Sequence, residues 1–131
     1  MLGNCPVFPY IPVSDLGRAR AFYEQVIGLV PMRDTDGGVV YGGANGSSIF
    51  MYVSANAGTS KASQAFWQVN DLAAEMAELR ARGVVFEEYD FPGFTMVNGV
   101  ATGGGAMTAW FKDIEGNTMA IVQPLPSQGH E

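Results

Sequence analysis

Cysteine and histidine are each represented once in this chain of 131 residues. The one cysteine, Cys5, excludes an intramolecular disulfide, and a protein without disulfides is expected in the reducing cytoplasm. The one histidine, His130, stands in the polar segment SQGHE, far along the chain from Cys5. A reactive thiolate needs a basic neighbour, so the pattern does not favour Cys5 as a catalytic nucleophile.

Positive charge is also scarce, with 7 Lys and Arg against 13 Asp and Glu and a net charge of −6. Because no basic cluster exists, nucleic acid is not an expected partner. No apolar run approaches the roughly 20 residues of a membrane span. The first residues do not form a basic and apolar leader, so we expect neither a membrane anchor nor a signal peptide. An acidic surface favours solubility and a cationic ligand.

The chain does contain ample material for a core, since 47% of its residues are hydrophobic. Patterning in the first half predicts a strand, a helix and three further strands. The helix begins at a cap formed by Ser14 or Asp15 and ends at Gly28. The strands are predicted at Val7–Val13, Val30–Asp34, Val39–Gly42 and Ile49–Val53.

The same order of elements recurs after a small and polar linker. A second helix is capped by Asn70 or Asp71 and ends at Gly83. Strands are predicted at Ala65–Val69, Val84–Tyr89, Met107–Lys112 and Thr118–Val122, with an irregular stretch at 92–105. Asp113 to Asn117 carry turn chemistry between the last two strands.

The two halves align in register. Val13-Ser14-Asp15-Leu16 aligns with Val69-Asn70-Asp71-Leu72, and Gly46 aligns with Gly116. A shared capping register and a shared order of elements indicate an internal repeat. We therefore predict one domain over 1–131, with a first module at about 6–54, a linker at 55–63, a second module at about 64–124 and a tail at 125–131.

Four segments carry a family resemblance. They are YIPVSDLGRARAFY at 10–23 followed by Gly28-Leu29, VNDL at 69–72, RGV at 82–84 and KDIEGN at 112–117. In order and spacing they resemble the vicinal oxygen chelate superfamily of glyoxalase I, bleomycin-resistance proteins and extradiol dioxygenases, although that family usually has proline where Ile114 stands. The resemblance implies an α+β fold of two βαβββ modules whose sheets form a shared cup.

Enzymes of this superfamily place metal ligands on four strands that line the cup. Carried over by position, these sites fall on Phe8, Phe50, Gln64 and Ala120. Only Gln64 offers a donor atom, an amide oxygen, whereas a divalent transition metal needs several nitrogen, oxygen or sulfur ligands. We therefore expect no metal and no other cofactor.

Alternation along the strands extends the cup face beyond these four positions. The candidate ligand-binding residues are Phe8, Tyr10, Phe50, Tyr52, Gln64, Phe66, Trp110 and Ala120. The opposite parity places mainly aliphatic residues toward the helices. These are Val7, Ile11, Val13, Ile49, Met51, Val53, Trp67, Val69, Met119 and Ile121. Aromatic walls with a few amides and hydroxyls suit a small neutral or cationic organic ring. The segment Phe91–Val100 is expected near the cup mouth.

Three functions remain open. The first is a metal-free protein that binds a small organic molecule in the aromatic cup, as bleomycin-resistance proteins do. The second is a lyase, isomerase or dioxygenase of the same superfamily with an atypical or no metal site, using Tyr10, Tyr52 or Glu87 as acid or base. The third is an interaction module whose aromatics fill the cup. The family usually associates as a homodimer, and the proline-rich first strand fits that expectation; no catalytic residue is assigned.

Overall fold

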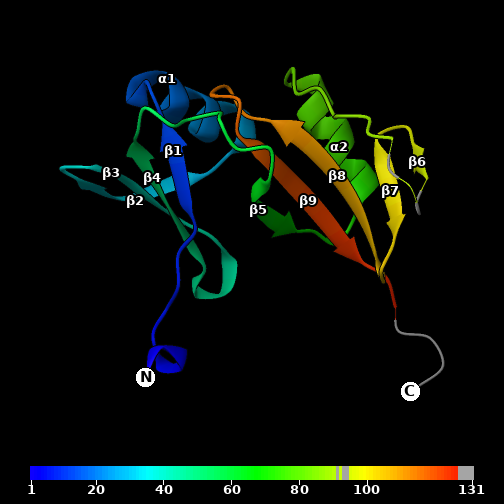
Figure 1. The fold of residues 1–131 in the computed structure, drawn as a ribbon, viewed down its shortest axis with the longest axis horizontal. Coiled ribbons are helices and arrows are strands. Elements are labelled where there is room, and N and C mark those ends of the chain that lie inside the picture. The colour runs from blue at the N-terminus through cyan, green and yellow to red at the C-terminus, as the bar shows by residue number, and fades with distance from the viewer. Residues whose placement is uncertain (91, 93–94, 127–131) are drawn as a thin grey trace.

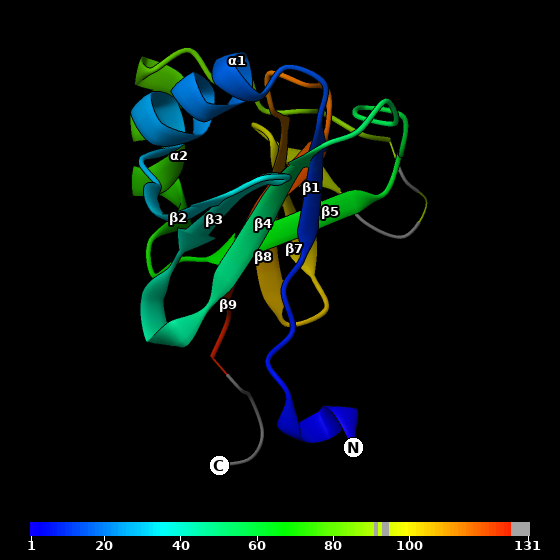
Figure 2. The same ribbon diagram turned by 90° about the vertical axis from the view of Figure 1, so that its left-hand side faces the viewer.

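Two β-sheets, with helices on one side of them, make up the computed structural model, which describes residues 1–90, 92 and 95–126 (Figures 1 and 2). The first sheet has the strand order β1-β4-β3-β2 and the second β5-β9-β8-β7-β6. The strands are β1 (Tyr10–Val13), β2 (Val30–Thr35), β3 (Gly38–Gly42), β4 (Ser48–Val53), β5 (Ser63–Gln68), β6 (Met96–Val97), β7 (Val100–Gly103), β8 (Ala106–Lys112) and β9 (Thr118–Pro124). The α-helices are α1 (Leu16–Ala21) and α2 (Leu72–Ala81). Within these described ranges, every helix is too short or too polar to cross a bilayer.

Both helices begin where the capping residues predict. The Asp15 carboxylate accepts from the N–H of Arg18 at 3.1 Å, and the Asp71 carboxylate accepts from the N–H of Ala74 at 3.0 Å. Helix α1 continues as a π-helical segment, Phe22–Ile27, which ends at Gly28 with φ of 88°. A left-handed residue at that point closes the helix, and glycine adopts this conformation without a Cβ clash.

The internal repeat is visible in the strand register. In the first sheet Tyr10 lies opposite Phe50, and in the second Phe66 lies opposite Ala120. Both pairs join the first strand of a module to its last strand in parallel. The predicted α+β class with two βαβββ modules is therefore confirmed.

Two predicted elements of the second module are wrong. The run 84–89 forms an isolated bridge between Phe86 and Phe111 instead of a strand. Conversely, the stretch 92–105 contains the hairpin of β6 and β7, which turns at Asn98 (φ 53°) and Gly99 (φ 83°). An Asn-Gly pair with positive φ at both positions is a favoured two-residue hairpin turn, and it is the sequence signal for this hairpin. Phe91 and Phe94 lie outside the described residues.

The first strand is shorter than predicted. Strand β1 begins at Tyr10, and the preceding residues 1–9 run away from the sheet as an arm (Figure 1). Pro9 still accepts through its carbonyl from the N–H of Phe50 at 3.0 Å. Prolines at 6 and 9 lack an N–H, so this part of the chain cannot donate to a regular ladder.

The core lies between the helices and the sheet faces that were predicted to meet them. Ile11, Val13, Met51, Met119 and Ile121 are all buried there. Two members of the predicted helix-facing set are exposed instead. Val7 belongs to the arm, and Val53 ends β4 at the sheet margin.

The turn 113–117 between β8 and β9 joins the two modules. Oδ1 of buried Asp113 accepts from the N–H groups of Glu115 (2.9 Å) and Asn117 (2.8 Å), which closes the turn. Oδ2 of Asp113 accepts from the Tyr23 hydroxyl at 2.5 Å, and Nδ2 of Asn117 donates to the Pro12 carbonyl at 2.7 Å. The turn of the second module is thus fastened to the helix and first strand of the first module.

The Glu115 side chain is 1% exposed and caps helix α1 from across the module boundary. Its Oε1 accepts from the N–H and the hydroxyl of Ser14, both at 2.8 Å. Its Oε2 accepts from the N–H of Asp15 at 3.1 Å and from the Arg18 guanidinium at 3.0 Å. Burial acts to raise the pKa of Glu115, but these four donors outweigh it and lower the pKa to about 2.

We expect Glu115→Gln to lower the free energy of unfolding by about 1.5–3 kcal/mol, the range for hydrogen bonds to a charged group. An amide presents an NH₂ where the second carboxylate oxygen accepts two bonds. The matched control is Glu78→Gln, which removes an exposed (i, i+4) pair with Arg82 and is expected to cost about 0.5 kcal/mol or less. Urea unfolding of the three proteins measures both differences.

Acidity gives an independent check on the same carboxylate. The pKa of Glu115 is lowered in the folded protein from an ordinary value of 4.5 to about 2, so its contribution is complete above pH 4.5. The contribution is lost as the pH falls from 4.5 toward 2. The stability gap between the wild type and Glu115→Gln should therefore narrow over this interval. A gap that stays constant on acidification would contradict the assignment.

Candidate functional site

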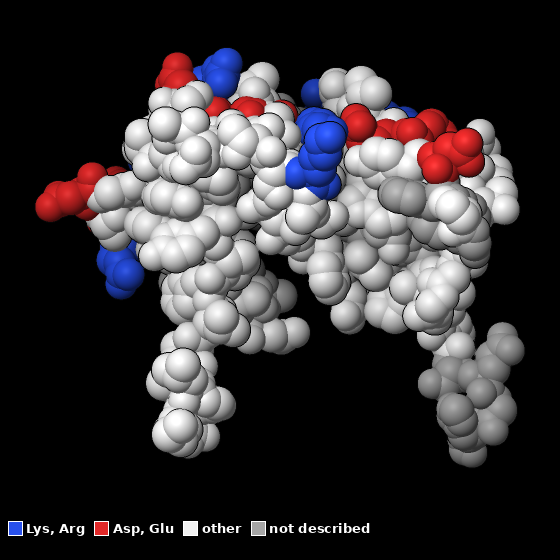
Figure 3. Space-filling view, in the orientation of Figure 1, with Lys and Arg blue, Asp and Glu red and all other residues white. Residues whose placement is uncertain are grey.

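Each sheet has a cavity on the face opposite the helices, and the surface between the sheets is hollowed (Figure 3). The first cavity has a volume of about 480 Å³ and lies over β1, β2, β3 and β4. Its lining residues are Phe8, Tyr10, Arg33, Thr35, Val40 and Phe50. The volume is in the range of small-molecule sites.

Strand register explains why these side chains meet. Tyr10, Phe50 and Val40 are direct neighbours across three strands, and Arg33 is opposite Val40 on the fourth. The Tyr10 and Phe50 rings are 5.7 Å apart in an edge-to-face arrangement. Tyr52 continues the cluster, with its ring 4.8 Å from Tyr10 and 6.3 Å from Phe50. Such contacts fix the rings in place while leaving Tyr10 exposed.

The second cavity has a volume of about 660 Å³ and lies over β8 and β9 beside the loop that leads into β5. Its lining residues are Gly58, Thr59, Ser60, Lys61, Ala62, Ser63, Tyr89, Trp110, Lys112, Gly116 and Thr118. The indole N–H of Trp110 donates to the Ser63 hydroxyl at 3.1 Å, and the Tyr89 ring stands 5.5 Å away, edge to face. The indole is thereby held in one orientation before any ligand arrives.

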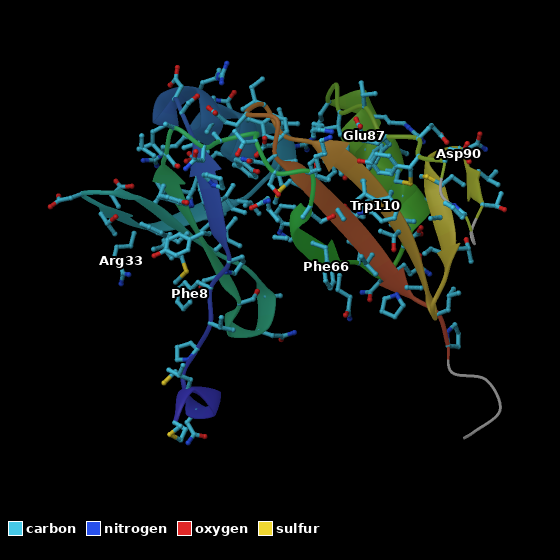
Figure 4. The ribbon with its side chains drawn as sticks, in the orientation of Figure 1. Phe8, Arg33, Phe66, Glu87, Asp90 and Trp110 are labelled. Atoms are coloured by element: carbon cyan, nitrogen blue, oxygen red, sulfur yellow. The ribbon has the colours of Figure 1, made fainter. Side chains whose placement is uncertain are left out.

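The eight predicted site residues are divided among different surroundings. Phe8, Tyr10 and Phe50 line the first cavity and Trp110 lines the second. Phe66 borders a third cavity of about 250 Å³, between the N-terminal arm and β5. Figure 4 shows Phe8 and Arg33 on one side of the hollow and Phe66 and Trp110 on the other. Tyr52 contacts the first cavity's rings, Gln64 is half-buried, and Ala120 is buried.

Among the lining residues that were not predicted, four are charged or aromatic: Arg33, Lys61, Tyr89 and Lys112. Arg33 follows an irregularity in the register of β2 between Pro31 and Arg33, which sequence alternation does not reveal. Lys61 belongs to the 55–63 stretch, which was interpreted as a plain linker.

The linker is in fact built into the fold. The Gly58 N–H donates to the Asn117 side-chain oxygen at 3.1 Å. A Cβ at Gly58 would lie 2.4 Å from the Glu115 carbonyl oxygen, so the close approach requires glycine. The loop that lines the second cavity therefore has a fixed position relative to the turn 113–117.

Two groups in or near the cavities have shifted pKa values: Tyr89 in the second cavity and Glu24 behind the first sheet. Burial raises the pKa of Tyr89 in the second cavity, and the charge of Glu87 adds to this while Lys112 opposes it. Behind the first sheet, the Tyr41 hydroxyl donates to Glu24 at 2.7 Å, and Arg20 donates to the same carboxylate at 2.9 Å. Burial acts to raise the pKa of Glu24, and these two donors lower it overall. Glu24 is thus a structural anion that pairs within the fold.

The four positions that correspond to the metal ligands of the superfamily's enzymes do not suit a metal ion. Phe8, Phe50 and Ala120 carry no donor atoms, and the Gln64 amide NH₂ donates to the Ala62 carbonyl at 3.2 Å. Across residues 1–90, 92 and 95–126, no group of three or more His, Cys, Asp or Glu side chains is arranged to hold a metal ion. Three of the four positions are therefore apolar, whereas a metal site needs several nitrogen, oxygen or sulfur ligands.

Comparison with known proteins identifies the fold. A family model described as Glyoxalase/Bleomycin resistance protein/Dioxygenase superfamily matches residues 7–125. A search of curated protein sequences finds no significant match.

Solved structures share the architecture at low sequence identity. TnmS3, an antibiotic binding protein from Streptomyces sp. CB03234, is 22% identical with a TM-score of 0.72, over 95% of this chain and 98% of that one. A glyoxalase/bleomycin resistance protein from the same strain is 21% identical with a TM-score of 0.62, over 86% and 94%. A glyoxalase/bleomycin resistance protein/dioxygenase from Nocardioides is 15% identical with a TM-score of 0.64, over 96% and 89%.

We expect the purified protein to carry no stoichiometric transition metal. The reason is the absence of donor atoms at three of the four strand positions. Elemental analysis checks the metal content, and thermal unfolding with and without a chelator should give the same melting temperature. Stoichiometric zinc, nickel, iron or manganese that disappears in Gln64→Ala would contradict this expectation.

Proposed function

Because the chain belongs to the Glyoxalase/Bleomycin resistance protein/Dioxygenase superfamily, we propose that it binds a small aromatic organic molecule on the concave faces of its sheets. Binding on this proposal uses aromatic contacts and hydrogen bonds, without a catalytic metal. The ligand-binding residues are Phe8, Tyr10, Phe50, Tyr52, Gln64, Phe66, Trp110 and Ala120, as the sequence predicts.

The observation that carries the proposal is the exposure of aromatic rings at formed cavities. Phe8, Tyr10 and Phe66 are 42%, 62% and 61% exposed, although aromatic side chains normally bury their large apolar area. The rings of Tyr10 and Phe50 border a cavity instead of filling a second core. An exposed apolar patch of this kind is typical of a binding site.

One structural relative supports the same class of function. TnmS3 is an antibiotic binding protein, and its fold spans nearly the whole of this chain. Its low identity bears on the fold alone, so the nature of the ligand is argued from the cavities of this protein.

The proposal includes a cytoplasmic homodimer. The arm at residues 1–9 exposes the apolar side chains of Met1, Leu2, Val7 and Phe8. A second copy would bury this arm together with the open sheet faces, and the two-fold dimer is the commonest arrangement among soluble homo-oligomers. The exposed single thiol of Cys5 suits a reducing compartment.

We expect Phe50→Trp to weaken binding of a ligand while costing little stability, because the larger ring reduces the space of the first cavity. A thermal-shift screen of aromatic compounds supplies the ligand, and titration calorimetry measures a loss of affinity of about tenfold, or 1.4 kcal/mol. The matched control is Val85→Trp, which adds an indole at an exposed position away from both cavities.

The control should bind as the wild type does. If Phe50→Trp unfolds the protein, the ring belongs to a core and the binding proposal fails. If the ligand is instead converted to product, the protein is a lyase, isomerase or dioxygenase of the same superfamily.

We expect a dimer in sedimentation velocity, and we expect removal of residues 1–8 to shift the protein toward monomer. The deletion removes exposed apolar side chains and leaves β1, which begins at Tyr10, intact. Circular dichroism controls for folding. A wild type that stays monomeric at tens of micromolar, roughly the range of micromolar affinities, would refute the dimer.

A further inference from the structure

The cationic side chains of this acidic chain differ in whether they have a hydrogen-bond or ion-pair partner. Of the 7 Lys and Arg residues, four donate hydrogen bonds that hold the fold together. These four are Arg18, Arg20, Arg80 and Arg82. A fifth, Lys112, lies 3.4 Å from the Glu87 carboxylate. Because these five side chains have partners within the protein, the fold itself explains their positions.

The remaining two cations, Arg33 and Lys61, have no hydrogen bond or ion pair within the described part of the chain. Both line the cavities on the concave faces, Arg33 in the first and Lys61 in the second. Neither cavity is lined by an Asp or Glu residue, although the chain contains 13 of them. Positive charge without a protein partner is thus concentrated where a ligand is proposed to bind.

The second cavity has the stronger character of an anion site. It brings together Lys61 and Lys112, and several hydroxyl side chains line it as well. The hydroxyls of Ser60, Ser63 and Thr118 can donate hydrogen bonds there, whereas the Thr59 hydroxyl already donates to the Asn56 carbonyl at 2.7 Å. The fixed indole of Trp110 forms an apolar wall beside them.

The acidic side chains lie elsewhere on the surface. Figure 3 shows most of them along the upper edge of the molecule, where Figure 4 places Glu87 and Asp90, and another group at the left-hand edge. Glu87 reaches Lys112 at 3.4 Å, which leaves Lys61 as the unpaired charge of the second cavity. The net negative charge of the chain is therefore a poor guide to the ligand, and the cavity favours the opposite sign from the cationic ring that composition suggests.

We propose that the second cavity binds the acidic group of an aromatic ligand, a carboxylate attached to or next to a ring that packs against Trp110. Lys61 and Lys112 are its cationic contacts, and the surrounding hydroxyls complete its hydrogen bonds. This proposal rests on the proposed function and names the chemical class of its ligand.

Three naphthalene probes of nearly equal size test the charge preference: 2-naphthoate, 2-naphthamide and 2-naphthylmethylammonium. Titration calorimetry at low ionic strength should give 2-naphthoate an affinity about tenfold higher than 2-naphthamide, the effect of one favourable charge contact near a surface. The ammonium probe should bind more weakly than the amide. The preference should shrink as salt is added, because exposed charges are screened.

Lys61→Met removes the charge and keeps an apolar stem, so it should reduce the preference for 2-naphthoate by severalfold and leave the amide affinity unchanged. Lys61→Arg should retain the preference. Arg33→Met removes an equal charge from the first cavity, so comparing it with Lys61→Met shows which of the two cavities provides the preference. Equal melting temperatures establish that the variants are folded.

The possible failures can be told apart. If the amide binds as tightly as the carboxylate, or the ammonium probe binds tightest, the charge inference is overturned and the aromatic binding function stands. If Lys61→Met keeps the preference and Arg33→Met loses it, the placement in the second cavity is wrong. If none of the three probes binds, both the inference and the proposed function fall.

Discussion

The buried carboxylate of Glu115 at the N-terminus of α1 is the interaction on which the rest of the structure depends. A helix start needs acceptors for its free N–H groups, and here two of the donors are backbone N–H groups of Ser14 and Asp15. The acceptor comes from the opposite module, so the helix of one half is completed only when the halves meet. Asp113 shapes the turn that presents this carboxylate, and its other oxygen accepts from Tyr23. The N-terminus of α1 is therefore fully capped only when the two modules are docked.

This constraint reaches the candidate site through Asn117 and Gly58. The turn holds the loop 58–63 by a hydrogen bond from the Gly58 N–H to the Asn117 side chain, and by a backbone contact at Gly58 that leaves no room for a Cβ. That loop supplies Lys61 and the Ser63 hydroxyl that orients Trp110. The second cavity is thus lined by a loop that the turn between the modules holds in place, whereas the first is formed by the register of the strands together with Phe8 of the arm. We therefore infer that the second cavity is the more strongly preorganised.

Local signals predicted the fold well, because they act within a few residues. The caps at Asp15 and Asp71, the helix ends at Gly28 and Gly83, and the alternation of the central strands follow from the sequence. The run 84–89 was mistaken for a strand because apolar residues there pack on the core through a single bridge at Phe86. The unpaired cations could not be predicted, because pairing depends on partners brought together by the fold. Glu115 and Arg18, for example, are joined across the module boundary.

The repeat also explains why two similar modules offer different cavities. Equivalent rows cross the sheets as Tyr10, Phe50 and Val40 in the first and as Phe66, Ala120 and Trp110 in the second. Beside the aromatic residue of the first strand, the first row carries Phe50 on β4, the last strand of its module. The second row carries Trp110 on β8, the strand before the last. The small residue of each row, Val40 or Ala120, is buried, which keeps the row packed while its large ring stands at the surface. Large and small side chains have thus exchanged places between neighbouring strands. The exchange keeps the side-chain volume of the row similar and changes which strand carries the aromatic ring.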